Sequence, residues 1–152
     1  MSRRVYRVCR SVHAQLDGQG AKRVGGRWNS PGRAVVYMAE SISLAVLENL
    51  VHMSREDFPD GYVSVSALIP DGLKIVTEDD LRKELPDLGS RDLGVPRGDS
   101  SASAVLRVRS AVVPAEFNYL LNPAQPEFAR IVVEPAEPFF FDERFFGKPE
   151  RR

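Results

Sequence analysis

The sequence is poor in cysteine: Cys9 is the only one, so no disulfide can form within the chain. Cysteine-based zinc patterns are excluded for the same reason. A metal site would have to be assembled from His13, His52 and carboxylates, and we expect no metal. No apolar run approaches the roughly 18 residues that a membrane helix requires, and the first residues lead into no apolar stretch of signal-peptide length. We therefore expect a cytoplasmic protein that binds no membrane.

The chain also lacks net charge, because 21 Lys and Arg residues balance 21 Asp and Glu residues. Its overall charge therefore provides no long-range attraction for nucleic acid. Within the first 33 residues, however, Asp17 is the only acid, and the basic residues there are Arg3, Arg4, Arg7, Arg10, Lys22, Arg23, Arg27 and Arg33. This distribution suits a phosphate-bearing ligand, and it equally suits a solvated basic surface balanced by acidic loops.

Three common motifs are missing from the sequence. It has no Walker phosphate loop, no Gly-x-Gly-x-x-Gly after a strand and no Ser-His-Asp spacing. P-loop, Rossmann and hydrolase-triad interpretations therefore lack support.

The pattern of apolar residues predicts one α+β domain over residues 1–152, because strands outnumber helices and do not alternate regularly with them. The clearest helix is Ser41–His52, in which Ser41 serves as the N-cap, and a second, short one covers 78–83. Residues 17–28 are predicted to form a glycine-punctuated loop, residues 85–100 a longer loop, and residues 147–152 a flexible tail. Strands are predicted at 5–9, 34–38, 62–69, 73–76, 104–113 and 130–133, with a further edge at 139–141.

Glu48 is the most unusual residue of the predicted helix over 41–52, which is otherwise almost wholly apolar. At helical spacing its neighbours include Leu44, Ala45 and Val51, so the carboxylate shares a face with hydrophobic groups. Such a placement is costly without partners and is enriched at functional sites. The alternative is that this face meets solvent and Glu48 is a surface acid.

Three other residues could contribute to a ligand site. Arg27 follows two glycines, which would let the backbone approach a ligand and direct a guanidinium at a diphosphate or carboxamide. It could equally stack on Trp28 or pair with an acid. Tyr37 ends an apolar strand and could be there only for packing, and Ser110 could be a polar residue within a strand end.

Two long segments together carry a resemblance to a known family. GGRWNSPGRAVVYMAES at 25–41 runs on to LAVLE at 44–48 and LVH at 50–52, and it resembles the first signature of the RES family. LRVRSAVVP at 106–114, followed by EFNYLLNP at 116–123, resembles the second. The resemblance covers about residues 5–133 and depends on both motifs in this order.

The resemblance implies a fold similar to that of ADP-ribosyltransferases, a split β-sheet with flanking helices, and NAD⁺ as substrate. It implies that Arg27, Glu48 and Ser110 are the residues for which the family is named. It also implies a role as the toxin of a bacterial toxin–antitoxin pair, with an Xre-type antitoxin that occludes the active site in an oligomeric complex. Some members of the family deplete NAD⁺ by hydrolysis or phosphorolysis, and others transfer ADP-ribose to a protein.

On this basis we hypothesise that Glu48 stabilises the positive charge that develops on the ribose when the nicotinamide bond breaks. Arg27 would hold the diphosphate, Tyr37 would pack on the nicotinamide ring, and Ser110 would orient Glu48 or the ribose. Asn118 is expected to act only as a supporting group in the binding site. A non-enzymatic module that binds a nucleotide or RNA is the alternative of another class, which the scarcity of interleaved aromatic residues disfavours.

Overall fold

The computed structural model describes residues 2–53, 59–87, 89 and 103–147 of the chain. Its centre is one mixed sheet with the strand order β4-β5-β6-β2-β1-β3-β7, and β8 also pairs with β3. All pairings are antiparallel except that of β4 with β5. The strands are β1 (Arg3–Arg10), β2 (Val36–Ala39), β3 (Tyr62–Ile69), β4 (Ile75–Thr77), β5 (Val105–Arg109), β6 (Phe117–Leu121), β7 (Val132–Val133) and β8 (Glu137–Phe139).

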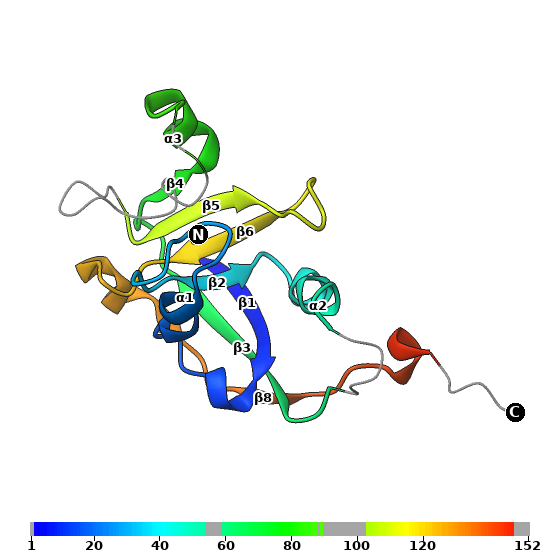
Figure 1. The fold of residues 1–152 in the computed structure, drawn as a ribbon. Helices are drawn as coiled ribbons and strands as arrows, with labels where there is room; N and C mark the ends of the chain where they lie inside the picture. The colour runs from blue at the N-terminus through cyan, green and yellow to red at the C-terminus, as the bar shows by residue number, and fades with distance from the viewer. Residues whose placement is uncertain (1, 54–58, 88, 90–102, 148–152) are drawn as a thin grey trace, which may run out of the picture.

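The described part of the chain has three α-helices: α1 (Gln19–Val24), α2 (Ile42–Leu50) and α3 (Glu78–Glu84). Short 3-10 helices cover Ser11–His13, Pro126–Arg130 and Glu143–Phe146. No helix in these ranges is long and apolar enough to cross a membrane. The predicted α+β class is confirmed, since few helices flank a mixed sheet (Figure 1).

The strand pairing divides the sheet into two halves. β1 pairs with β3 along its whole length, from Arg3 opposite Ile69 to Arg10 opposite Tyr62, whereas it pairs with β2 only where Tyr6 lies opposite Ala39. β2 instead pairs along its whole length with β6. β1 and β2 therefore diverge from a narrow contact (Figure 1), and residues of both strands line a cavity.

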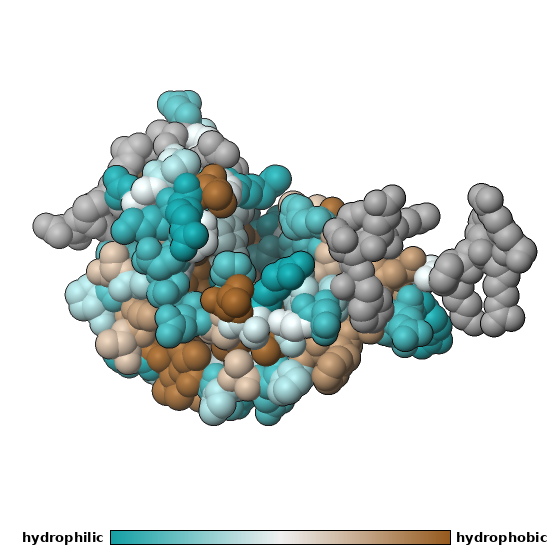
Figure 2. All heavy atoms as spheres, turned by 60° about the horizontal axis from the view of Figure 1, so that its bottom comes forward, coloured by the Kyte–Doolittle hydropathy of each residue, from teal (hydrophilic) through white to brown (hydrophobic). Residues whose placement is uncertain are grey.

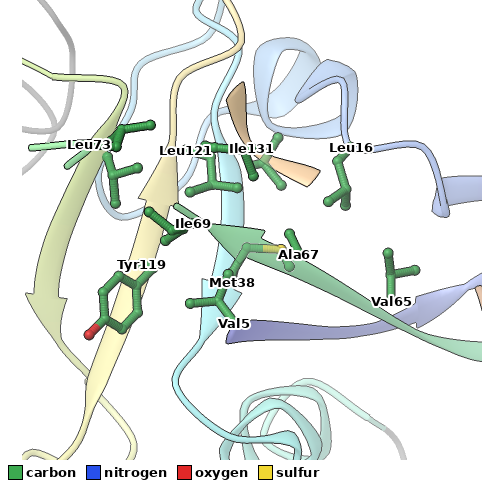
Figure 3. Close-up of a cluster of buried hydrophobic side chains, with 12 residues drawn as sticks. Val5, Leu16, Met38, Val65, Ala67, Ile69, Leu73, Tyr119, Leu121 and Ile131 are labelled. Atoms are coloured by element: carbon green, nitrogen blue, oxygen red, sulfur yellow. The ribbon is translucent and has the colours of Figure 1, made fainter. Parts of the chain in front are cut away.

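One cluster of buried hydrophobic side chains joins the two halves of the sheet. Figure 3 shows side chains of β1, β2, β3 and β6 meeting in it, among them Val5, Met38, Ala67 and Tyr119, all of which are buried. Burial of apolar surface on this scale is the main stabilising contribution to the fold.

Helix α2 is attached to the divided sheet from the side. Ser41 accepts a hydrogen bond from the backbone N–H of Leu44 at 3.1 Å, which confirms the predicted N-cap. Leu44 and Ala45 are buried against Val8 and Ala39, and the Asn49 side chain donates to the Val8 carbonyl at 2.7 Å. The helix is thereby held over the space between β1 and β2.

Several local predictions were wrong in detail. Residues 19–24 form α1 within the predicted glycine loop, and β6 was not predicted at all. The strand predicted over 104–113 ends at Arg109, because the chain turns at Ser110. Of the strand predicted at 130–133, only β7 at 132–133 forms, and a 3-10 helix precedes it. The edge predicted at 139–141 is observed as β8 at 137–139. Most of the predicted 85–100 loop and residues 148–152 of the predicted tail lie outside the described residues.

Candidate active site

Glu48 is half-buried on α2, and its carboxylate accepts two hydrogen bonds on one oxygen. The Ser110 hydroxyl, at the end of β5, donates to Oε1 at 2.6 Å. The Asn118 side-chain amide, on β6, donates to the same oxygen at 2.9 Å. Oε2 accepts no hydrogen bond from the described residues, so it is the oxygen left to interact with a ligand.

Ser110 is 2% exposed, and its hydroxyl is fully used by the protein. Its oxygen accepts hydrogen bonds from the backbone N–H groups of Val112 at 3.1 Å and Val113 at 3.0 Å. Its single hydrogen is donated to Glu48. Because a hydroxyl has one donor and two acceptor positions, this arrangement suits Ser110 to holding Glu48 and not to acting as a nucleophile.

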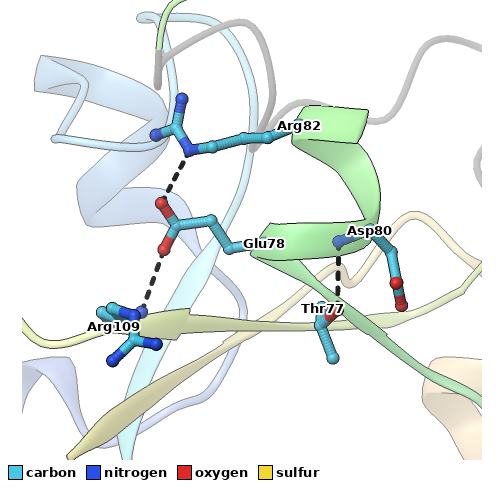
Figure 4. A network of polar contacts seen from close by, with 5 residues as sticks. All are labelled: Thr77, Glu78, Asp80, Arg82 and Arg109. Atoms are coloured by element: carbon cyan, nitrogen blue, oxygen red, sulfur yellow. Dashed lines mark hydrogen bonds and ion pairs between the residues drawn. The ribbon is translucent and has the colours of Figure 1, made fainter. Parts of the chain in front are cut away.

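Glu78 joins the start of α3 to the end of β5 (Figure 4). Glu78 accepts a hydrogen bond from the backbone N–H of Arg109 at 3.1 Å and another from the Arg82 guanidinium at 2.8 Å. Thr77 caps α3 by accepting from the Asp80 N–H at 3.2 Å. These contacts fix the end of β5 and so contribute to the placement of the residue that follows it.

The Tyr37 side chain lies close against the backbone of the loop that carries Arg27. The Tyr37 hydroxyl accepts a hydrogen bond from the Trp28 N–H at 3.1 Å and donates to the Asn29 side chain at 2.6 Å. A Cβ at Gly26 would lie 2.6 Å from the Tyr37 hydroxyl, so only glycine fits at this position without a shift. Tyr37 therefore anchors the loop through its hydroxyl, and its ring borders the site.

Asn29 is a structural centre of this loop that sequence reasoning missed. It is 0% exposed, and its amide nitrogen donates to the carbonyls of Ala21 at 2.9 Å and Arg33 at 3.0 Å. An asparagine in a glycine-rich loop resembles any turn residue, and its burial was the signal that only the structure provided.

Arg27 itself is exposed, and it forms no hydrogen bond or ion pair with another described residue. The alternative in which Arg27 stacks on Trp28 is not observed, because the guanidinium over that ring, at 5.7 Å, belongs to Arg82. Its charge is thus available to a ligand.

Two adjoining cavities, with volumes of about 1010 Å³ and 520 Å³, surround Glu48. The larger is bordered by α1, the Arg27 loop and α2, and the smaller lies where β1 and β2 diverge. The two share the lining residues Arg7, His13, Tyr37, Glu48, His52 and Asn118. The molecular surface is hollowed near the middle of the face in Figure 2, where hydrophilic and hydrophobic side chains border the hollow.

Four of the five predicted site residues line the larger cavity: Arg27, Tyr37, Glu48 and Asn118. The fifth, Ser110, is not among the described lining residues and lies behind the Glu48 carboxylate, to which it donates. The structure thus places four of the predicted residues on one cavity and the fifth in contact with Glu48.

Basic side chains outnumber acidic ones in the lining of the larger cavity. The acids there are Asp17 and Glu48, and the basic groups are Arg7, Arg23, Arg27, Arg109, His13 and His52. Arg7, on β1, is half-buried at the junction of the two cavities and was not singled out from the sequence. Burial raises the pKa of the nearby Cys9 thiol against the opposing effect of Arg7. The lining suits a ligand with several negative charges.

Metal ligands are not grouped in this site. Within the described ranges, no three His, Cys, Asp or Glu side chains are placed to hold a metal ion together. The arrangement offers one oriented carboxylate among basic side chains.

The fold and this site define a small α+β protein with a carboxylate held at the junction of two cation-lined cavities. The chain belongs to the RES domain family, whose model matches residues 4–142.

Curated relatives in three bacteria match most of the chain. It is 37% identical to a protein of Photorhabdus laumondii named "Toxin Res", over 84% of this chain and 86% of that protein. It is 38% identical to a "Toxin Res" of Pseudomonas putida, over 90% of this chain and 96% of that protein. A Sphingobium protein named "Prs ADP-ribosylating toxin" is 35% identical over 88% of each chain.

A solved structure has the same fold. The crystal structure of the M. tuberculosis MbcT-MbcA toxin-antitoxin complex contains a chain that matches with a TM-score of 0.60 and 18% identity. The match covers 92% of this chain and 85% of that one, and at this identity it concerns the fold alone.

Proposed function

We propose that this chain is the toxin of a bacterial toxin–antitoxin pair and that it cleaves the nicotinamide–ribose bond of NAD⁺. The proposal is supported by the family membership and by relatives that carry the name of a toxin. The single observation that carries the chemistry is the Glu48 carboxylate, whose Oε1 is held by Ser110 and Asn118 while the residue lines the cavity that Arg27 also lines.

The reaction requires a fixed negative charge beside the ribose. When the bond from C1′ to the nicotinamide nitrogen breaks, its electron pair leaves with nicotinamide and positive charge develops on C1′ and the ring oxygen. Glu48, oriented before the reaction by two donors, would stabilise that charge without reorganisation in the transition state. Water, phosphate or an acceptor side chain then forms the new bond to C1′ and gives up a proton.

The remaining residues have roles in binding NAD⁺. Arg27, exposed and unpaired among the described residues, would engage the diphosphate as a planar fork. The Tyr37 ring would pack on nicotinamide, since its hydroxyl is already committed to Asn29 and Trp28. Arg7 adds positive charge at the junction of the cavities.

The test is to incubate the pure protein with NAD⁺, with and without phosphate, and to identify the products by chromatography and mass spectrometry. Nicotinamide with ADP-ribose indicates hydrolysis, and a phosphorylated ADP-ribose that forms only with phosphate indicates phosphorolysis. NAD⁺ that stays intact in both reactions, but is consumed when cell extract is added, would favour the second candidate function below.

A second candidate is transfer of ADP-ribose to a specific protein. It is favoured by the Sphingobium relative, which is named as an ADP-ribosylating toxin. When the protein is incubated with cell extract and NAD⁺ labelled in its ADP-ribose part, the label should appear on one protein band. The candidate is excluded if no protein band carries label and the label is recovered as free ADP-ribose.

A toxin of this kind needs a partner that restrains it, and we propose an Xre-type antitoxin that occludes the larger cavity in an oligomeric complex. Val12, Val24 and Val51 are 80%, 77% and 58% exposed and border that cavity beside its cationic lining. Such a rim suits a segment that bears both apolar and carboxylate side chains.

Binding of the antitoxin and of NAD⁺ should then be mutually exclusive. Arg27→Ala should weaken both, as measured by calorimetry with purified antitoxin and with NAD⁺. A complex that binds NAD⁺ with unaltered affinity, or an Arg27→Ala variant with full affinity for the antitoxin, would show that inhibition acts elsewhere.

A further inference from the structure

Asn118 lies on β6 between the strands that flank it, opposite Ala39 of β2 and Val108 of β5. Its strand neighbour Tyr119 is buried in the main core, and side chains alternate between the faces of a strand. Asn118 therefore projects from the other face, toward α2, where its amide nitrogen reaches Glu48 Oε1 at 2.9 Å. It also borders both cavities.

The orientation of the Asn118 amide has a cost. Its oxygen, Oδ1, is buried and has no hydrogen-bond partner among the described residues. A buried carbonyl oxygen without a donor destabilises the fold. Turning the amide around would remove its donor from Glu48 and set two acceptor oxygens against each other. The interaction with Glu48 thus determines the orientation, although the fold would be more stable without the unpaired oxygen.

Two donors on one oxygen have a geometric consequence. The outermost torsion of a glutamate side chain is broad, so one hydrogen bond leaves the plane of the carboxylate poorly defined. Ser110, directly after β5, and Asn118, on β6, both donate to Oε1, and together they restrict that rotation. Oε2 is then presented to the cavity in one direction.

We infer that Asn118 is a positioning residue that orients the Glu48 carboxylate, and that it is retained for this purpose at the expense of stability. This inference rests on the proposed function for its effect on turnover. It assigns Asn118 a contact with Glu48 and not with NAD⁺, which gives the expected supporting role a specific partner and purpose.

The test is Asn118→Leu, which removes the donor and the unpaired oxygen together at similar side-chain size. We expect a melting temperature equal to or above that of the wild type and an unchanged dissociation constant for NAD⁺. We expect kcat to fall by about 10²-fold, the size of effect that misplacement of a reacting group produces. The matched control is Asn122→Leu, since Asn122 follows β6, caps the Ala124 N–H and is absent from both described linings.

A second readout does not depend on turnover. The NMR chemical shift of the Glu48 side-chain carboxyl carbon, recorded at one fixed pH, should differ between Asn118→Leu and the wild type, because one hydrogen-bond donor to Oε1 has been removed. It should not change in Asn122→Leu, and an unchanged shift in Asn118→Leu would contradict the inference.

The outcomes separate this inference from the proposed function. A wild type that leaves NAD⁺ intact refutes the proposed function, and the chemical shift of the Glu48 carboxyl carbon still decides the role of Asn118. If the wild type consumes NAD⁺, an Asn118→Leu variant with normal kcat overturns the inference. It is also overturned by a variant that melts at a lower temperature, or by one that loses NAD⁺ affinity in place of turnover.

Discussion

Glu48→Gln is the substitution that removes the proposed catalytic charge with the least disturbance. The amide oxygen of glutamine can accept the same two hydrogen bonds that Oε1 accepts, from Ser110 at 2.6 Å and from Asn118 at 2.9 Å. The new NH₂ group then takes the place of Oε2, which accepts no bond from the described residues. The fold should therefore keep its contacts, and only the charge facing the ribose is lost.

The magnitude follows from the loss of one preorganised electrostatic contact, which costs about 10² to 10³ in rate. The assay is the initial rate of nicotinamide release at saturating NAD⁺, with circular dichroism and thermal melting as checks on folding. The matched control is Glu84→Gln, an exposed glutamate at the end of α3 that lines neither described cavity. A well-folded Glu48→Gln protein with near-normal turnover, or an equal loss in the control, would refute the assignment.

Two further substitutions test the residues around Glu48. Arg27→Lys should raise the dissociation constant for NAD⁺ in calorimetry, because an ammonium cannot reproduce the planar fork of a guanidinium. Arg33→Lys, outside both described linings, is the control, and an unchanged constant for Arg27→Lys would argue against a contact with the diphosphate. Tyr37→Phe keeps the ring but removes the bonds to Trp28 and Asn29, each loss worth about 1 kcal/mol or more. At about 2–4 °C per kcal/mol for a chain of this size, we expect the melting temperature to fall by at least about 4 °C. NAD⁺ affinity should fall with it as the Arg27 loop loosens, and an unchanged melting curve would show that the hydroxyl does not anchor this loop.

The sequence by itself determined the features that depend on neighbours a few residues apart. The Ser41 cap and the apolar spacing of the following turns predicted α2, and the alternation of residues 62–69 predicted β3. The two long motifs indicated the family, and the family model matches residues 4–142, which contain both motifs. Glu48 could be singled out from its neighbours at helical spacing, because it is a carboxylate on an otherwise almost wholly apolar helix.

Local signals failed where distant groups stabilise the backbone. Residues 19–24 contain glycine and looked like a loop, but α1 forms there with Asn29 donating to the Ala21 carbonyl. β6 carries Asn118 within a run of apolar residues, which interrupts its pattern, and it is held as a strand by β5 on one side and β2 on the other. β5 ends before Ser110 because the hydroxyl oxygen of Ser110 accepts hydrogen bonds from the backbone N–H groups of Val112 and Val113. These two bonds turn the chain.

Only the tertiary structure decided how the site is assembled. Ser110 and Asn118 lie 62 and 70 residues from Glu48 in the sequence, and they meet it because β6 lies between β5 and β2 while α2 is attached beside β1. The separation of β1 from β2 beyond Tyr6 and Ala39 opens the space over which the carboxylate stands. Such contacts depend on strand order and register, which result from packing over the whole domain and have no counterpart in the spacing of residues along the chain.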